Sequence, residues 1–282
     1  MPPTSPSHRE RVARFRQLHE SGCFVMPNPW DIGSAVVLEK LGFPAIATTS
    51  GGFAFSRGMP DDGSVIPCEL MLAHVREIAA ATSLPVNADF QSGYALDLEQ
   101  LASNVRRCAE TGVAGLSIED ATEDPAQPLF ERARAIERIR ATRKAIDDSG
   151  TEVVLTARCE AWLVGDPDPL RTALDRLPAF AAAGADCLYA PGVQDPEAIR
   201  ALVAAVAPKP LNVLLYKPSE PIRVHTLADL GVRRVSVGAA LARHAWSGFL
   251  RAARSLLQTG GFDPSAGMAT SADLDPFFRP NR

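Results

Sequence analysis

Two short segments of this sequence end in acidic residues that could do chemistry. Residues 86–94 read VNADFQSGY, in which an apolar start leads to Asp89, and residues 115–120 read GLSIED, in which an apolar start leads to Glu119. Parallel strands of an α/β barrel bring their carboxyl ends to one rim, so we expect these two acids to meet there. Carboxylate oxygens are ligands that Mg²⁺ prefers. The pattern therefore predicts a divalent metal site at the rim.

An arginine follows a later apolar segment, at a position where its side chain would lie in the mouth of the barrel. Arg158 ends the segment 153–157 and stands two residues before Glu160. Charges in a confined mouth are costly unless they pair with one another, with a metal or with a ligand. Two interpretations therefore stay open: an internal ion network of Arg158, Glu119 and Asp89, or a metal site beside a cation that receives an anionic ligand. We favour the second, because each carboxylate is followed by loop residues rather than by more apolar core.

A Ser-Gly-Gly tripeptide at positions 50–52 is a second candidate site for an anion. Glycine lets backbone N–H groups approach a ligand closely. The alternative is a tight turn that needs glycine for a positive φ. The next segment, 53–64, is expected to be a long loop that contains Asp61 and Asp62. Loops of this length over an active face often act as gates.

The composition limits the classes of protein to which the chain can belong. Its 282 residues are 46% hydrophobic and carry a formal net charge of −4, which argues against a nucleic-acid partner. No apolar run approaches the ~20 residues of a membrane span, and no secretory signal is expected. Five cysteines in no paired spacing predict reduced thiols and a cytoplasmic protein. We expect the five histidines at the surface or at helix ends, and see no zinc-binding spacing.

Strand-like and helix-like segments alternate from about residue 23 to residue 258. About eight such units with short connections predict a closed (β/α)₈ barrel of the TIM type. No Gly-x-Gly-x-x-Gly motif follows the first strand, which disfavours a dinucleotide-binding sheet. The predicted strands are Cys23–Met26, Ala45–Thr49, Pro85–Asp89, Gly115–Glu119, Val153–Ala157, Cys187–Ala190, Leu211–Leu215 and Arg234–Val237. The predicted helices between them are Leu70–Ala81, Leu98–Thr111, Phe130–Asp147, Asp168–Ala183, Pro196–Val206 and Leu227–Leu230.

Three regions are expected along the chain. Residues 1–20 form an arm with a short helix, residues 21–258 form the barrel, and residues 259–282 form a tail. An apolar helix is predicted over Ala239–Leu257, after the eighth strand. Because a barrel is already closed, this helix must cover the outside of the barrel or another subunit, so we expect subunit association.

With these residues in view, the chain resembles the isocitrate lyase/phosphoenolpyruvate mutase superfamily over about residues 10–258. The resemblance implies an (α/β)₈ barrel, assembly as a homodimer or homotetramer with exchanged C-terminal helices, a Mg²⁺ or Mn²⁺ site, and a small 2-oxo acid as substrate or product. The matching motifs are Thr49-Ser50-Gly51-Gly52, Ala88-Asp89-x-x-x-Gly93-Tyr94, Ser117-Ile118-Glu119-Asp120, Ala157-Arg158 and Val235-Ser236-Val237-Gly238.

The resemblance also implies roles for individual residues. Asp89 and Glu119 would be metal ligands, direct or through water, and Gln91 occupies a position that usually holds a further acid. Asp61 best fits the acid of the gating loop, although the spacing also allows Asp62. The residues predicted to bind substrate are Ser50, Gly51, Gly52, Arg158 and Asn212, and those predicted to act in catalysis are Arg158, Asp61 and Ser50.

The chain departs from the superfamily pattern at three places. Gln91 removes a negative charge from the metal site. The loop after the fourth strand, residues 120–129, reads DATEDPAQPL and lacks the cysteine, lysine and histidine of the lyases. The histidine that follows the sixth strand in the mutases, and their Lys/Asn pair, are also absent.

These departures favour decarboxylation of a β-keto acid such as oxaloacetate. Retro-aldol cleavage needs one group to remove a hydroxyl proton and another to reprotonate the enolate, and phosphoryl migration needs cationic cover. Decarboxylation needs mainly a stabilised enolate. The alternatives are a 2-methylisocitrate or dimethylmalate lyase with Asp61 or Glu123 as base, a phosphonopyruvate hydrolase or mutase, and a barrel that binds a 2-oxo acid without turnover.

Overall fold

Eight parallel strands form one nearly closed barrel, which confirms the predicted fold class. The computed structural model describes residues 6–62, 65–216, 222–263 and 267–279. The strands are hydrogen-bonded in the order β1-β8-β7-β6-β5-β4-β3-β2, and a hydrogen bond from Ala47 N to Pro27 O (3.0 Å) links the two ends. They are β1 (Phe24–Met26), β2 (Ile46–Ala47), β3 (Val86–Asp89), β4 (Gly115–Glu119), β5 (Val154–Arg158), β6 (Cys187–Tyr189), β7 (Leu211–Leu214) and β8 (Arg234–Ser236).

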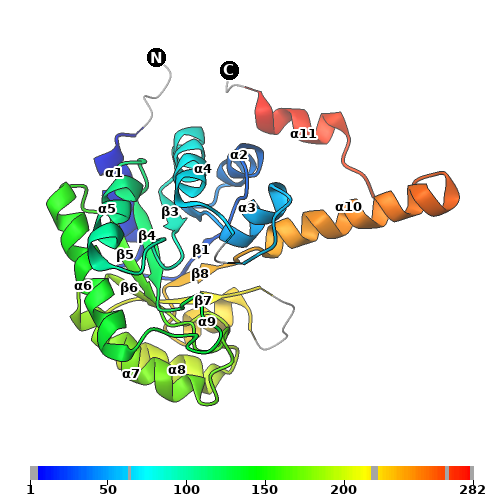
Figure 1. Ribbon diagram of the computed structural model, residues 1–282. Helices are drawn as coiled ribbons and strands as arrows, with labels where there is room; N and C mark the ends of the chain where they lie inside the picture. The colour runs from blue at the N-terminus through cyan, green and yellow to red at the C-terminus, as the bar shows by residue number, and fades with distance from the viewer. Residues whose placement is uncertain (1–5, 63–64, 217–221, 264–266, 280–282) are drawn as a thin grey trace.

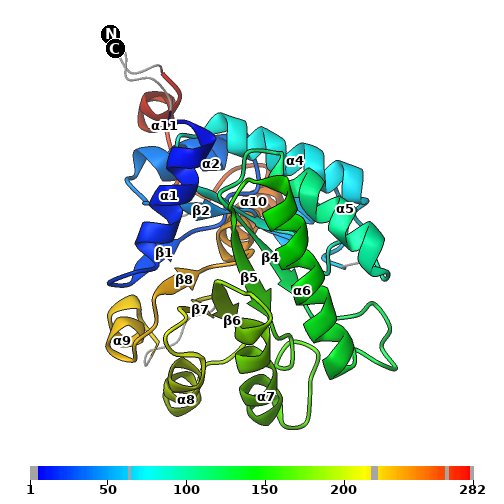
Figure 2. The ribbon, with the colours of Figure 1, turned by 90° about the vertical axis from the view of Figure 1, so that its left-hand side faces the viewer.

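Helices surround the strands (Figures 1 and 2). Within the described ranges, none of them combines the length and hydropathy needed to cross a bilayer. Their bounds are α1 (His8–Leu18), α2 (Ile32–Lys40), α3 (Ser50–Ser56), α4 (Cys68–Ala81), α5 (Leu98–Ala109), α6 (Arg132–Ser149), α7 (Pro169–Ala182), α8 (Pro196–Val206), α9 (Val224–Asp229), α10 (Ala240–Thr259) and α11 (Ser271–Phe278). The predicted strands and most predicted helices agree with these bounds to within two residues.

Three helices were not predicted: α2, α3 and α11. Helix α3 begins at the Ser-Gly-Gly tripeptide, so residues 53–56 are helical rather than part of a long loop. Thr49 caps this helix by accepting a hydrogen bond from Gly52 N (3.3 Å). A Cβ at Gly52 would lie 3.0 Å from Trp30 Cβ and 3.2 Å from Ala242 Cβ, so close packing requires glycine there. The alternative of a positive-φ turn is wrong, and residues 63–64 of the predicted loop lie outside the described part.

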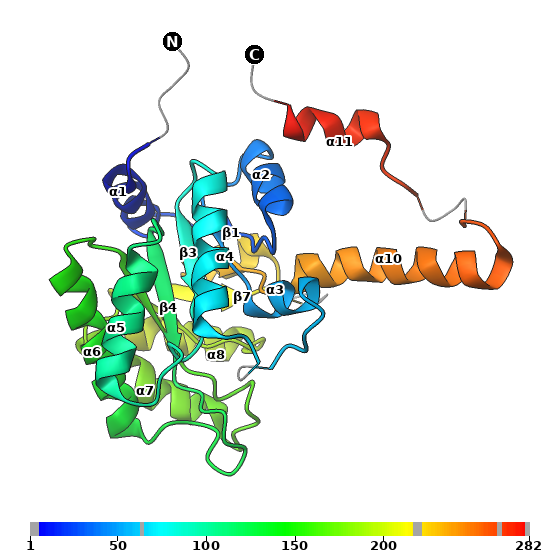
Figure 3. The same ribbon diagram turned by 45° about the horizontal axis from the view of Figure 1, so that its top comes forward.

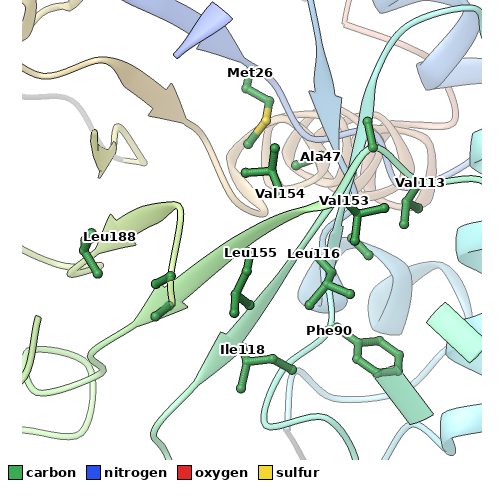
Figure 4. Close-up of a cluster of buried hydrophobic side chains, with 14 of the residues drawn as sticks. Met26, Ala47, Phe90, Val113, Leu116, Ile118, Val153, Val154, Leu155 and Leu188 are labelled. Atoms are coloured by element: carbon green, nitrogen blue, oxygen red, sulfur yellow. The ribbon is translucent and has the colours of Figure 1, made fainter. Parts of the chain in front are cut away.

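The core lies on both faces of the barrel wall. Leu116 and Ile118 of β4 are fully buried in the apolar layer beneath the helices (Figure 4). The alternate residues Ser117 and Glu119 point into the barrel, as the two-residue period of a strand requires. At the amino end of the barrel, α1 inserts Phe15 against Gly115, where a Cβ would come within 2.7 Å of the Phe15 ring. The amino end of the barrel is therefore closed by side chains, and the carboxyl end is left for a site.

The last two helices leave the barrel wall. Helix α10 extends away from the barrel and α11 returns toward α2 (Figures 1 and 3), where Lys40 Nζ donates to Arg279 O (2.8 Å). Ala242 is buried on α10, whereas Phe249 is 60% exposed and Leu257 is 87% exposed. Helix α10 thus presents large apolar side chains to solvent.

Candidate functional site

A cavity of about 610 Å³ opens at the carboxyl ends of the strands. This is the rim at which barrel enzymes place their chemistry. Acidic side chains predominate among the charged residues that line it within the described ranges: Asp61, Asp62, Asp89, Glu119, Glu123, Asp124 and Glu160, with the two arginines Arg158 and Arg234. Of the predicted site residues, Ser50, Gly51, Gln91 and Asn212 also line this cavity, whereas Gly52 is buried in α3 and packs against neighbouring elements.

Asp89 is held by its neighbours on β2 and α3. Its backbone N–H donates to Thr48 Oγ1 (2.9 Å). Ser50 donates to Asp89 Oδ2 twice, from its backbone N and from its Oγ, at 2.9 Å each. The other oxygen, Oδ1, accepts from Arg158 Nη1 at 2.6 Å. The two donors of Ser50 therefore orient Asp89, the carboxylate predicted to bind metal. That Ser50 also contacts the substrate directly stays a prediction.

Arg158 joins three carboxylates at the end of β5. Besides Asp89, its guanidinium contacts Glu119 Oε2 (3.0 Å) and forms a two-pronged pair with Glu160 (2.8 and 3.1 Å). The Tyr189 ring lies beside it, 5.3 Å from the guanidinium carbon to the ring centroid. The internal ion network, which was the alternative interpretation, is thus present in the structure. The role of Glu160 was missed; its spacing of two residues from Arg158 was the available signal.

Burial controls the protonation of these acids. It raises the pKa of Glu119 to about 8, against the opposing effect of Arg158, and the neighbouring Glu160 and Asp89 add to the rise. Burial also raises the pKa of Glu160 and of Asp61, and the Asp89 charge contributes in both cases. The mouth of the barrel therefore holds more negative charge than one arginine can compensate, and a cation or protons must supply the balance.

The oxygen donors at the mouth fit a hard divalent cation. The described residues contain no cluster of three or more His, Cys, Asp or Glu side chains arranged for a metal. Asp89 and Glu119 nevertheless share one partner, and Gln91 Oε1 is buried without a hydrogen-bond partner in the described ranges. An unpartnered buried acceptor is costly unless water or an ion completes it. Two carboxylates and one amide oxygen, with several waters, suit Mg²⁺.

The backbone at Gln91 is held in a sparsely populated conformation. Its φ is 45°, in the left-handed region, and that of Tyr94 is 56°. Asn104 Nδ2 donates to the carbonyls of Gly93 (3.0 Å) and Tyr94 (3.2 Å), and the buried Arg138 donates to the carbonyl of Ser92. Such conformations persist where surrounding contacts impose them, and they cluster at functional sites.

Asp61 lies over the start of α3. A Cβ added at Gly51 would come closer than 3.0 Å to the Asp61 carboxyl group, so glycine permits this approach. Asp61 and Asp62 both line the cavity. The assignment of the gating acid to Asp61 stays a prediction.

Asn212 lies deeper, in a chain of hydrogen bonds. Its Oδ1 accepts from Arg234 Nε (2.9 Å), and its Nδ2 donates to Ser236 Oγ (2.9 Å). Arg234 was not singled out from the sequence. Its alternation with Ser236 on one strand was the signal, because residues two apart face the same side.

The loop after β4 closes one side of the cavity. Ala121 and Leu129 pair as an antiparallel bridge, and Thr122 N donates to Pro128 O (2.9 Å). Glu123 and Asp124 of this loop line the cavity. The loop contributes acids, and its sequence contains no lysine, histidine or cysteine.

One sequence expectation about the histidines is wrong. His74 is 3% exposed and stacks on Phe53 with ring centroids 3.8 Å apart, because α4 turns this side chain inward. His19 ends α1, as expected of a helix-end residue, and its ring points into the barrel base beside Phe15 and Phe24.

An α/β barrel with paired acids and an arginine at its mouth defines the class as barrel enzymes with a small-molecule site. The chain belongs to the phosphoenolpyruvate phosphomutase family, which residues 15–257 match. This places it in the superfamily that the sequence motifs indicated, whose members include lyases and mutases.

Similar proteins carry several names. Protein Rv1998c of Mycobacterium tuberculosis is 34% identical over 79% of this chain and 81% of its own length. The 2-methylisocitrate lyase of Halalkalibacterium halodurans is 29% identical (73% and 67%), and the oxaloacetate decarboxylase of Pseudomonas savastanoi is 29% identical (80% and 78%). Among solved structures, a protein of Burkholderia cenocepacia J2315 provisionally named a lyase/mutase is 42% identical, with a TM-score of 0.91 over 96% of this chain and 97% of that one.

Proposed function

We propose that this protein is a Mg²⁺-dependent carbon–carbon lyase that acts on a small 2-oxo or 2-hydroxy dicarboxylate, with oxaloacetate decarboxylation as the leading reaction. The observation that carries the proposal is the convergence of Asp89, Glu119 and Gln91 at the mouth of a cavity whose covering loop supplies no acid–base cysteine, histidine or lysine. With a cation bound, such a site is equipped to stabilise negative charge, and its covering loop lacks the cysteine, lysine and histidine with which the lyases transfer protons.

The residues of the chain would divide the work as follows. Asp89, Glu119 and Gln91 would hold the cation, Mn²⁺ being a possible replacement for Mg²⁺. When bound, the cation supplies Lewis acidity to the oxygen that becomes negative as the C–C bond breaks. Ser50 holds Asp89 in place, and Arg158 remains next to both acids. Asp61, over Gly51, would shield the site from water and exchange a proton with the product carbon.

The test is metal-dependent pyruvate release. Oxaloacetate is offered to the Mg²⁺-loaded protein, with the spontaneous rate in buffered Mg²⁺ subtracted. We expect EDTA to abolish the enzymic rate and Asp89→Ala to lower it by roughly 100-fold or more. Asp97→Ala, at the cap of α5 and outside the cavity, is the control. Pyruvate release that ignores both EDTA and Asp89→Ala would contradict the proposal, and thermal stabilisation by oxaloacetate without turnover would favour a binding barrel instead.

A 2-methylisocitrate or dimethylmalate lyase is the second candidate. Glu123 lines the cavity from the loop after β4, where the lyases have their proton-transferring residues, and Asp61 lines it from the segment after α3. The same pyruvate assay with these two substrates separates the candidates. A higher kcat/KM than for oxaloacetate, lost in Glu123→Gln, would replace decarboxylation by this reaction. Phosphonopyruvate is included for the mutase or hydrolase alternative.

We also propose that α10 packs against another copy of the chain. Trp246 and Phe249 form an edge-to-face pair (centroids 5.4 Å apart) on a helix with large exposed apolar side chains. Such a surface is typical of an interface. Light scattering should give a dimer or tetramer that dissociates in the double variant Trp246→Glu/Phe249→Glu. A wild-type monomer at micromolar concentration would contradict this assembly.

A further inference from the structure

Arg234 is a buried cation beneath the cavity. It is 1% exposed, and its guanidinium donates Nε to Asn212 Oδ1 (2.9 Å) and Nη2 to Thr156 Oγ1 (3.0 Å). Its Nη1 lies 3.3 Å from His19 Nε2. Thr156 precedes Arg158 by two residues on the same face of β5, so Arg234 lies one layer deeper in the barrel.

The charge of Arg234 has no carboxylate partner within the described ranges. The titratable groups around it are His19, Cys187 and Tyr189. Burial lowers the pKa of His19 to about 3, and it raises the pKa of Cys187 and of Tyr189. All three are therefore neutral near pH 7, and the charge stays uncompensated.

Burying an unpaired cation is expensive, which calls for an anion that completes it. The cavity above offers the place: seven acidic side chains and two arginines line it in the described ranges. Arg158, the other lining arginine, is already shared among three carboxylates, whereas Arg234 lines the same cavity with no carboxylate partner among the described residues.

Asn212 connects Arg234 to the cavity. Because Arg234 holds Oδ1, the amide cannot flip, and Nδ2 faces Ser236 Oγ. An amide Nδ2 has two hydrogens, and Ser236 uses one. The second is a donor for a ligand in the cavity that Asn212 lines.

We propose that Arg234 is a positioning residue that fixes the donor face of Asn212 and supplies the positive charge that selects a ligand with two carboxylates over one with a single carboxylate. This inference rests on the proposed function, since it concerns the carboxylate end of the same substrate.

Two probes of nearly equal shape test the inference. Oxalate carries two carboxylates, and oxamate replaces one of them by an amide. Binding of each to the Mg²⁺-loaded, full-length protein is measured by calorimetry, and the ratio of the two affinities is compared among variants. We expect Arg234→Met to lower the oxalate-to-oxamate ratio by roughly tenfold or more, about 1.4 kcal/mol.

A conservative variant separates charge from folding. Arg234→Lys keeps the charge but cannot reach three acceptors, so the ratio should recover to within a fewfold of wild type while both ligands bind more weakly. Arg143→Met is the matched control: Arg143 is also largely buried, pairs with Asp186 at 3.1 Å, and lies outside the cavity. Its ratio should not change.

Asn212→Asp keeps the test decisive if Arg234→Met does not fold. The new carboxylate provides Arg234 with a counterion, so the melting temperature should be maintained while oxalate binding falls more than oxamate binding. An unchanged ratio in Arg234→Met, or in Asn212→Asp, with normal wild-type binding overturns this inference alone. A wild-type protein that binds neither probe contradicts the proposed function and this inference with it.

Discussion

Two arginines lie inside the barrel one layer apart, and their surroundings are opposite. Arg158, at the mouth, contacts Asp89, Glu119 and Glu160. Arg234, below it, contacts the neutral Asn212, Thr156 and His19. The mouth has an excess of negative charge and the base an excess of positive charge. This contrast supports the proposals that the mouth holds a cation and that the layer below attracts an anion.

The largest expected effect comes from removing the cation of the mouth. Arg158→Ala leaves three buried carboxylates without their partner, so we expect the free energy of unfolding to fall by about 3–5 kcal/mol. Mg²⁺ should restore more stability to this variant than to wild type, because it replaces the missing charge. Urea unfolding with and without Mg²⁺ measures both.

The control for this variant is an exposed ion pair. Arg132 pairs with Asp175 at 2.6 Å, with about half of each side chain exposed. Its replacement by alanine should cost under about 1 kcal/mol and respond to Mg²⁺ as wild type does. An Arg158→Ala protein as stable as Arg132→Ala would remove the contrast between mouth and surface.

For binding, we expect Arg158→Ala to weaken substrate affinity more than metal affinity.

The base of the barrel should make the protein sensitive to acid. The pKa of His19 is lowered from 6.5 to about 3, first by burial and then by the Arg234 charge. The unfolded state therefore binds the proton more readily, and the stability contributed by His19 is complete above pH 6.5 and lost as the pH falls toward 3. At pH 5 the loss is about 2 kcal/mol, at about 1.4 kcal/mol per unit.

His19→Gln tests this sensitivity. Glutamine keeps a neutral acceptor for Arg234 and does not titrate, so its unfolding free energy should fall less between pH 7 and pH 5 than that of wild type. Urea titrations at the two pH values give the difference. Because His74, with a pKa lowered to about 4 by burial, contributes a similar slope in both proteins, the comparison isolates His19. An equal pH dependence of the unfolding free energy in wild type and in His19→Gln would contradict the role assigned to His19.

A smaller effect is expected from restoring an acid at the mouth. Gln91→Glu adds a carboxylate at a buried oxygen that has no partner in the described ranges, so Mg²⁺ affinity should rise by roughly tenfold. Gln194 has a similarly unpartnered Oε1 but does not line the cavity, so Gln194→Glu is the matched control. Calorimetric titration of Mg²⁺ into both variants would show equal affinities if Gln91 is remote from the cation.

The elements of the barrel could be predicted because their signals are local. Apolar runs bounded by glycine and polar residues gave the strands to within two residues, and the apolar period gave most helices. Helix α3 could not be predicted, since Gly51 and Gly52 lower helix propensity. It forms because Thr49 caps it and because Gly52, which has no side chain, lets the helix pack closely against Trp30 and Ala242.

The sequence by itself determined which residues lie at the rim, because the carboxyl ends of parallel strands must meet there. It therefore predicted that Asp89, Glu119 and Arg158 would be neighbours. Only the tertiary structure decided which charges pair and which do not, since pairing depends on distances between strands far apart in the chain. Among the residues that the structure describes, Arg158 has three acidic partners and Arg234 has none; this difference is a property of the closed barrel, and no local pattern predicts it.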